Sequence, residues 1–97
     1  MKQYKINENN ITYDIEEQFD GDKTWYKNGK RHRENGPACE WSDGTKIWYK
    51  NGLHHRDDGP ACEYANGSID YWYNGKRLEN INSYEDLLRY IKFLSIS

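Results

Sequence analysis

Hydrophobic and polar residues alternate near the start of the chain with the period of a β-strand. Ile11, Tyr13 and Ile15 would share one face of a strand over residues 11–17, with polar residues between them on the other face. A first strand over residues 2–6 would precede it across a polar, asparagine-rich connection. The two segments therefore predict a starting hairpin.

The C-terminal segment 83–97 has a helical period instead. Its apolar residues are three or four positions apart: Tyr84, Leu87, Leu88, Ile91 and Leu94. Ser83 is a favourable N-cap, and Asp86 three residues on is a weak version of the capping-box acid. Glu85 and Arg89 could pair on the other side. The pattern predicts an amphipathic helix whose apolar stripe packs over the sheet and shields its last strand.

Between these ends the chain repeats itself. Residues 20–42 and 43–65 align without gaps, and 15 of their 23 positions are identical. A third copy over residues 66–82 keeps an aromatic run and an Asn-Gly pair but loses the rest of the unit. A degenerate last copy is typical of a capping repeat. We therefore expect one domain over 1–97, with a starting hairpin (1–19), two full repeats, a capping repeat (66–82) and a C-terminal helix (83–97).

Each full repeat has the pattern of two short strands and two turns. Lys46–Lys50 is β-prone, and the Asn51-Gly52 pair that follows is a strong hairpin signal. Asp57–Pro60 is a second turn, and a strand over 61–65 follows it. Turns this close together leave no room for parallel crossovers. The predicted fold class is all-β: an antiparallel meander of repeated β-hairpins, roughly eight strands in a single elongated sheet, with a C-terminal amphipathic α-helix.

Composition narrows the class of protein. In these 97 residues hydrophobic side chains make up 35% and aromatic ones 15%, so the core would be thin and built from large rings. A net charge of −2 disfavours a dedicated nucleic-acid binder. No stretch has the apolar length of a signal peptide or a membrane span. We expect a cytoplasmic protein (host cytosol if viral) with both cysteines reduced, no membrane association and no direct nucleic-acid binding.

A composite motif links the repeats to a known family. Trp-Tyr-Lys-Asn-Gly at 25–29, His32-Arg33 and Gly-Pro-Ala at 36–38 recur 23 residues later. Over about 20–78 this unit resembles MORN-like repeats of phages, giant viruses and bacteria. The resemblance implies stacked hairpins in one sheet and a non-catalytic scaffold or binding role. Phage members of the family suggest a small accessory protein that docks on a host protein, such as a defence component, and inhibits or modulates it; anti-CRISPR activity would be one form of this.

Positions that differ between the two full copies are free of the demands of stacking. They include the pairs Lys30/Leu53, Arg31/His54, Glu34/Asp57 and Trp41/Tyr64. With the aromatic run of the third copy they give the candidate partner-binding residues: Trp41, Leu53, His54, Tyr64, Trp72 and Tyr73. The alternative for each ring is an ordinary place in the core. We predict a protein partner, no cofactor and no catalytic residues.

Protein binding has three kinds of alternative: an anion site, chemistry at the cysteines and histidines (zinc binding or catalysis), and self-assembly. His32, Arg33, His55 and Arg56 could form an anion site for a small molecule or nucleotide, or each Arg could pair internally with Glu40 or Glu63. Cys39 and Cys62 with the two histidines form a possible zinc ligand set, but their spacing is wrong for one, and we predict no metal. Catalysis by the same residues is disfavoured because an active site is seldom duplicated in adjacent repeats. Edge pairing of sheets into a structural homo-oligomer is the third alternative.

Overall fold

The structure is a computed structural model that describes residues 1–96. Within this range it contains eleven strands and one helix. In chain order these are β1 (Lys2–Glu8), β2 (Ile11–Glu17), β3 (Lys23–Lys27), β4 (Lys30–Arg31), β5 (Cys39–Glu40), β6 (Lys46–Ile47), β7 (Tyr49–Lys50), β8 (Leu53–His54), β9 (Cys62–Glu63), β10 (Ile69–Tyr73), β11 (Lys76–Leu78) and α1 (Tyr84–Ile96).

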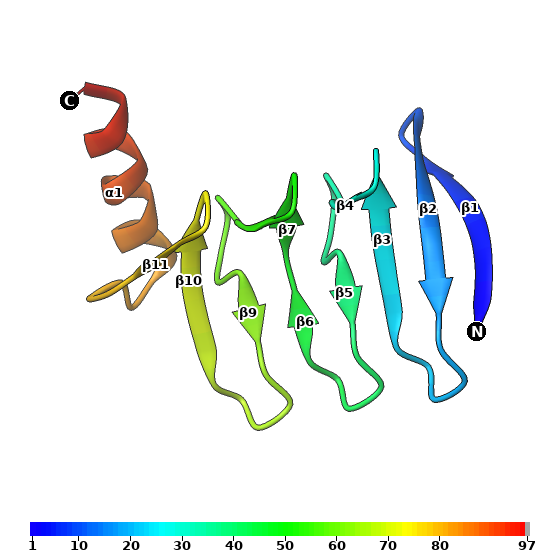
Figure 1. The fold of residues 1–97 in the computed structure, drawn as a ribbon. Coiled ribbons are helices and arrows are strands. Elements are labelled where there is room, and N and C mark those ends of the chain that lie inside the picture. Colours follow the sequence, from blue (N-terminus) through cyan, green and yellow to red (C-terminus); the bar gives the residue numbers. More distant parts are fainter. Residues whose placement is uncertain (97) are drawn as a thin grey trace.

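Nine of the strands form an antiparallel meander in one elongated sheet, and β7 and β8 pair with each other as a separate two-stranded sheet (Figure 1). The continuous path of the elongated sheet runs β1-β2-β3-β5-β6-β9-β10-β11, and β4 pairs beside β5 on β3. The short strands arise because residues 32–38 leave the sheet between β4 and β5, and residues 55–61 leave it between β8 and β9. The predicted all-β meander with a C-terminal helix is confirmed.

Two kinds of turn close the hairpins, at opposite ends of the sheet (Figure 1). Asn28 and Gly29 both have positive φ, 52° and 78°, as a type I′ turn requires, and the two later Asn-Gly pairs repeat this geometry. The starting hairpin has the same kind of turn at Asn9-Asn10, so β1 extends to Glu8, two residues beyond the predicted strand. The turns at the other end are closed by backbone bonds such as Trp41 N–H to the Thr45 carbonyl, 2.8 Å.

One face of the sheet, the Trp face, carries the two repeat tryptophans. Directly opposed residues alternate in charge across the strands: Lys2, Glu17, Lys23, Glu40, Lys46 and Glu63. Trp25 lies two residues beyond Lys23 and Trp48 two beyond Lys46, so both tryptophans share this face, one repeat apart. The repeat interpretation predicts this equivalence.

The opposite face, the Cys face, carries Cys39 and Cys62. Both thiols are buried and free, and burial raises the pKa of each. Ile47 pairs with Cys39 on one side and with Cys62 on the other, so a whole strand separates the cysteines. Strands lie about 4.8 Å apart, which puts the two Cα atoms beyond the reach of a disulfide. The expected free thiols agree with this geometry.

The helix begins as predicted but presents a different face. Ser83 Oγ accepts the Asp86 N–H at 3.2 Å, the expected N-cap bond. Leu87 is fully buried beside Tyr71 and Leu78, and Tyr90 and Ile91 pack around it.

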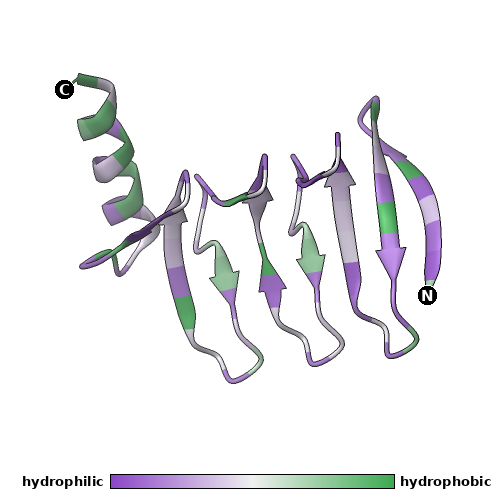
Figure 2. Cartoon of the chain, in the orientation of Figure 1, coloured by the Kyte–Doolittle hydropathy of each residue, from purple (hydrophilic) through white to green (hydrophobic). Residues whose placement is uncertain are grey.

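The predicted stripe is therefore wrong in part. Leu88 is 38% exposed, and Tyr84 and Leu94 are exposed too. Arg89 pairs with Asp86 at 2.9 Å rather than with Glu85. The helix stands beside the end of the sheet (Figure 1), and apolar residues occur on more than one of its sides (Figure 2). In residues 1–96 no helix is long and apolar enough to span a membrane.

Candidate binding face

A row of rings and cations crosses the upper part of the Cys face, near the Asn-Gly turns. Its members, here called the ring row, are Tyr26, Arg31, Tyr49, His54, Trp72 and Arg77. In each of the hairpins β3-β4, β7-β8 and β10-β11, the aromatic residue on the first strand is the cross-strand partner of the Arg or His on the second. The repeat therefore places one ring and one nitrogen-bearing side chain at this level in every copy.

The centre of the ring row is a stack. The His54 ring lies 4.6 Å from the Trp72 ring at an angle of 28° and 4.5 Å from the Tyr49 ring. Burial lowers the pKa of His54, and the nearby Arg31 cation lowers it further. The imidazole is thus held neutral, as a flat ring between two aromatic neighbours.

Lower on the same face, Tyr64 joins the last strands. Its hydroxyl donates to Asp70 at 2.8 Å, which raises the pKa of Tyr64. Asp70 also accepts two bonds from Arg77. Tyr64 is 38% exposed, so its ring remains accessible while its hydroxyl is fixed.

The structure does not bring all the candidate residues together. His54, Tyr64 and Trp72 lie on the Cys face, and Trp41 is half-buried against the main core cluster. Leu53 and Tyr73 alternate with them and point to the Trp face. Leu53 lies over the turn at Gly75 and is 48% exposed. Tyr73 packs against the rings of His55 and Tyr90.

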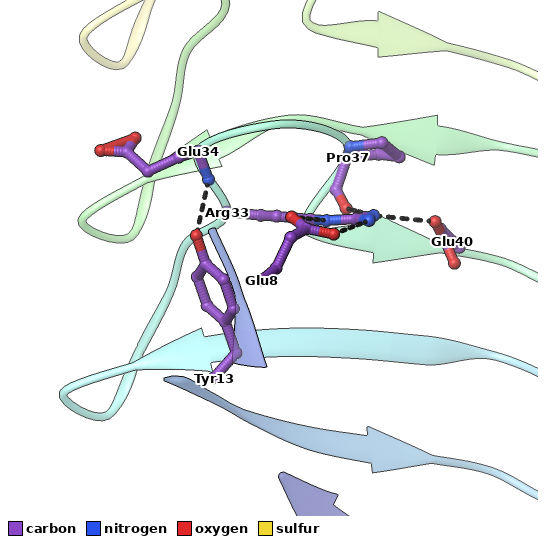
Figure 3. Close-up of polar contacts among 6 residues, drawn as sticks. All are labelled: Glu8, Tyr13, Arg33, Glu34, Pro37 and Glu40. Carbon is purple, nitrogen blue, oxygen red and sulfur yellow. Dashed lines mark hydrogen bonds and ion pairs between the residues drawn. The ribbon is translucent and has the colours of Figure 1, made fainter. Parts of the chain in front are cut away.

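Arg33 and Arg56 are built into the repeat. The Arg33 guanidinium lies 3.7 Å from the centre of the Trp25 ring, and Arg56 lies 3.8 Å from that of Trp48. Arg33 also donates to Glu40, to the Pro37 carbonyl and to both oxygens of Glu8 (Figure 3). Arg56 makes the equivalent bonds to Glu63 and the Pro60 carbonyl. The internal pairing with Glu40 and Glu63 is thus what the structure contains.

The repeat glycines after these arginines follow from the same packing. A Cβ on Gly36 would lie 2.9 Å from Arg33 Cζ, and one on Gly59 would lie 2.9 Å from Arg56 Cζ. Neither glycine has positive φ. Each is required because the guanidinium is sandwiched between a tryptophan ring and bare backbone.

The two histidines of the possible anion site also serve the repeat. His32 Nδ1 accepts the Asn51 N–H at 3.0 Å, and His55 Nδ1 accepts the Asn74 N–H at 2.9 Å. Both rings are buried and tie one repeat to the next Asn-Gly turn. A pocket of about 370 Å³ lies between the two His-Arg loops, with His55 and both arginines in its walls. The polar groups that would bind an anion there are already engaged in internal bonds.

Sequence reasoning missed part of the ring row. Arg31 belongs to a pair that differs between the copies, but only its counterpart His54 is among the candidates predicted from the sequence. Tyr26, Tyr49 and Arg77 are not among those candidates either. The sequence does contain a signal for the two tyrosines. Tyr26 and Tyr49 each lie directly before Lys-Asn-Gly, and the residue across the turn from each differs between the repeats.

Among residues 1–96 no group of three or more His, Cys, Asp or Glu side chains is placed to hold a metal ion. Comparison of the chain with protein-family models, with curated proteins and with solved structures found no match.

Proposed function

We propose that this chain is a non-catalytic protein-binding module that uses the Cys face. One observation carries the proposal. The Trp, His and Arg residues of the motif, which both full repeats share, are engaged in internal contacts. His54 and Tyr64, which break the repeat, lie half-buried or exposed on one face beside Trp72. Aromatic side chains anchored in this way are typical of binding hot spots.

The resemblance to MORN-like repeats of phages extends the proposal to the partner. A host protein, such as a defence component that the chain inhibits or modulates, would be the target. Leu53 also differs from its counterpart in the first repeat, but it is exposed on the Trp face, near the Asn-Gly turns. It is included in the test for that reason.

The experiment converts the second repeat into the first. Leu53→Lys, His54→Arg and Tyr64→Trp each install the residue that the other copy already carries, so folding should be nearly unchanged. The wild-type chain is immobilised, proteins retained from a bacterial lysate are identified, and the affinity of the purified partner for each variant is measured by calorimetry. His54→Arg or Tyr64→Trp should weaken binding by about 1 kcal/mol or more.

Asp57→Glu is the matched control, because it also restores the other copy's residue but lies in a loop off the Cys face. It should leave the affinity unchanged. Equal affinity of all four variants would overturn the use of the Cys face. Failure to retain any partner, together with a nucleotide-induced thermal shift that needs Arg33 or Arg56, would favour the small-molecule alternative. Concentration-dependent light scattering would favour self-assembly.

A further inference from the structure

Arg31 differs from every other arginine in residues 1–96. Arg33, Arg56, Arg77 and Arg89 each have a carboxylate within 4 Å. No such ion pair involves Arg31 in the described part of the chain. Its guanidinium is half-buried and permanently charged. Removing such a cation from water without an anionic partner is costly.

The surroundings of Arg31 hold it in place without neutralising it. Nη1 donates to the Tyr49 hydroxyl at 3.3 Å, and the guanidinium lies 5.4 Å from the centre of the Tyr49 ring. Tyr26 is its cross-strand partner on the other side. The backbone is fixed as well, since the Arg31 carbonyl accepts the Gly52 N–H at 2.9 Å. A preorganised fork of N–H donors between two tyrosines suits a bidentate carboxylate.

The charges nearby indicate what kind of anion fits. A groove of about 500 Å³ beside Tyr26 has Lys5, Asp14 and Glu16 in its walls, with Lys5 paired to Asp14. Asp70, which is paired with Arg77, lies farther along the same face. A polyanion such as a nucleic-acid backbone would meet these carboxylates on either side of Arg31. Tyr49, His54 and Trp72 in the row are neutral rings, and the other cation of the row, Arg77, is already paired with Asp70. One negative charge flanked by apolar groups is therefore the complementary ligand.

From this geometry we infer that Arg31 is the docking point for an Asp or Glu side chain of the protein partner, with the flanking partner residues packing on the half-buried rings of Tyr26 and His54. This rests on the proposed function and names the chemistry of its contact. It also accounts for a difference between the repeats. His54, at the equivalent position, is neutral and packed between rings, so the ring row has a cation in the first repeat, a neutral ring in the second and, at Arg77, a cation already paired with Asp70.

The test follows the Arg31 Nε–H resonance by NMR in the full chain. The probes are the blocked tripeptide Phe-Asp-Phe, its uncharged analogue Phe-Asn-Phe, inorganic phosphate and a short oligothymidylate. The Asp peptide should shift this resonance saturably and bind about threefold or more tighter than the Asn peptide, as a partly exposed charge pair allows. Phosphate and the oligonucleotide should bind more weakly than the Asp peptide.

Two variants give the controls. Arg31→His installs the residue of the second repeat, should remain folded, and should abolish the preference for Asp over Asn. Lys30→Leu removes the same unit of charge one residue away, also by copying the second repeat, and should keep the preference.

Equal binding of both peptides, preferential binding of phosphate or oligonucleotide, or an unchanged preference in Arg31→His would overturn the inference. A captured protein partner whose affinity does not change in Arg31→His would do the same while leaving the proposed function intact. Conversely, Arg31-dependent peptide binding with no protein partner would support this site and contradict the proposed function.

Discussion

The two full repeats make the same Trp–Arg–Gly sandwich but complete it with different partners. In the second repeat Arg56 takes its additional carboxylate from its own loop, through Asp58 at 2.7 Å. The first repeat has the neutral Asn35 at that position, and Glu8 of the starting hairpin supplies the charge to Arg33 instead, at 2.8 Å (Figure 3).

The repeat tryptophan is also more deeply buried in the first repeat than in the second. Trp25 is 3% exposed because the Tyr13 ring meets it edge-on at 5.3 Å, whereas Trp48 is only half-buried. The starting hairpin thus acts as a cap that closes the first repeat. The sandwich is therefore common to both repeats, and what differs is the group that completes it: the starting hairpin in the first repeat and the repeat's own loop in the second.

The largest expected effect is loss of the ring. Trp25→Ala should destabilise the protein by about 3–5 kcal/mol, because a buried ring and its support for Arg33 are both removed. Trp48→Ala should cost less, about 2 kcal/mol, because part of that ring is already in water. Urea unfolding of both variants measures the difference. Equal losses would contradict the role of the starting hairpin as a cap.

The next effect concerns the bare backbone of the sandwich. Gly36→Ala and Gly59→Ala should each cost about 1–3 kcal/mol, because the new methyl group forces the guanidinium away. The control is a double-mutant cycle. In an Arg33→Lys background Gly36→Ala should cost under about 0.5 kcal/mol, because the planar group is gone. An unchanged cost would mean that the glycine is required for another reason.

Local signals explain what could be predicted. The Asn-Gly turns and the equivalence of Trp25 and Trp48 depend on residues close in sequence or on the period itself, and both are found in the structure. The turn of the starting hairpin lies at Asn9-Asn10, inside the predicted asparagine-rich connection, but the sequence did not give its exact position because asparagine is a weaker signal for positive φ than glycine.

Other features depend on distances between strands that no local pattern contains. Apolar residues of α1 span an arc wide enough to form two overlapping stripes, and only packing selects the one centred on Leu87 over the one containing Leu88. That Arg33 would reach Glu8, and that Arg31 would meet no carboxylate in residues 1–96, follows from the register of separate hairpins. The amino-acid composition alone therefore could not predict which carboxylates these arginines meet.

A smaller effect separates the two ion pairs. Glu8→Gln should cost about 1 kcal/mol, because its carboxylate is largely shielded and bonds Arg33 twice. Asp58→Asn should cost under about 0.3 kcal/mol, because Asp58 is 69% exposed. Asn35→Asp should recover part of the loss in the Glu8→Gln variant, since it gives the first repeat the acid of the second. No recovery would show that position 35 cannot reach Arg33.

The stability that the Glu8–Arg33 pair contributes should depend on pH. Its bonds to Arg33 hold the pKa of Glu8 below the ordinary value. A lowered carboxyl pKa contributes stability that is present above the unfolded value of about 4.3 and lost as the pH falls through the folded one. Acid unfolding of Glu8→Gln should therefore show a smaller loss of stability than the wild type across that range.

The last and smallest effect concerns the histidine that joins the second repeat to the third. His55 Nδ1 accepts the Asn74 N–H, so the imidazole must be neutral with its proton on Nε2; a protonated ring would place two donors face to face. Burial lowers the pKa of His55, and Lys50 lowers it further. The unfolded chain therefore binds a proton more readily than the folded one. The stabilising contribution of His55 is complete above the unfolded pKa of about 6.5 and is lost as the pH falls below it toward the folded pKa.

Urea midpoints at pH 7.5 and 5.5 should show a decrease for the wild type and a smaller decrease for His55→Gln, whose amide oxygen can still accept the bond but does not titrate. His54→Arg, measured in parallel, removes the contribution of the neighbouring imidazole, whose pKa is lowered too. A decrease in His55→Gln as large as that of the wild type would assign the pH dependence to other groups and leave the His55–Asn74 bond without a role in it.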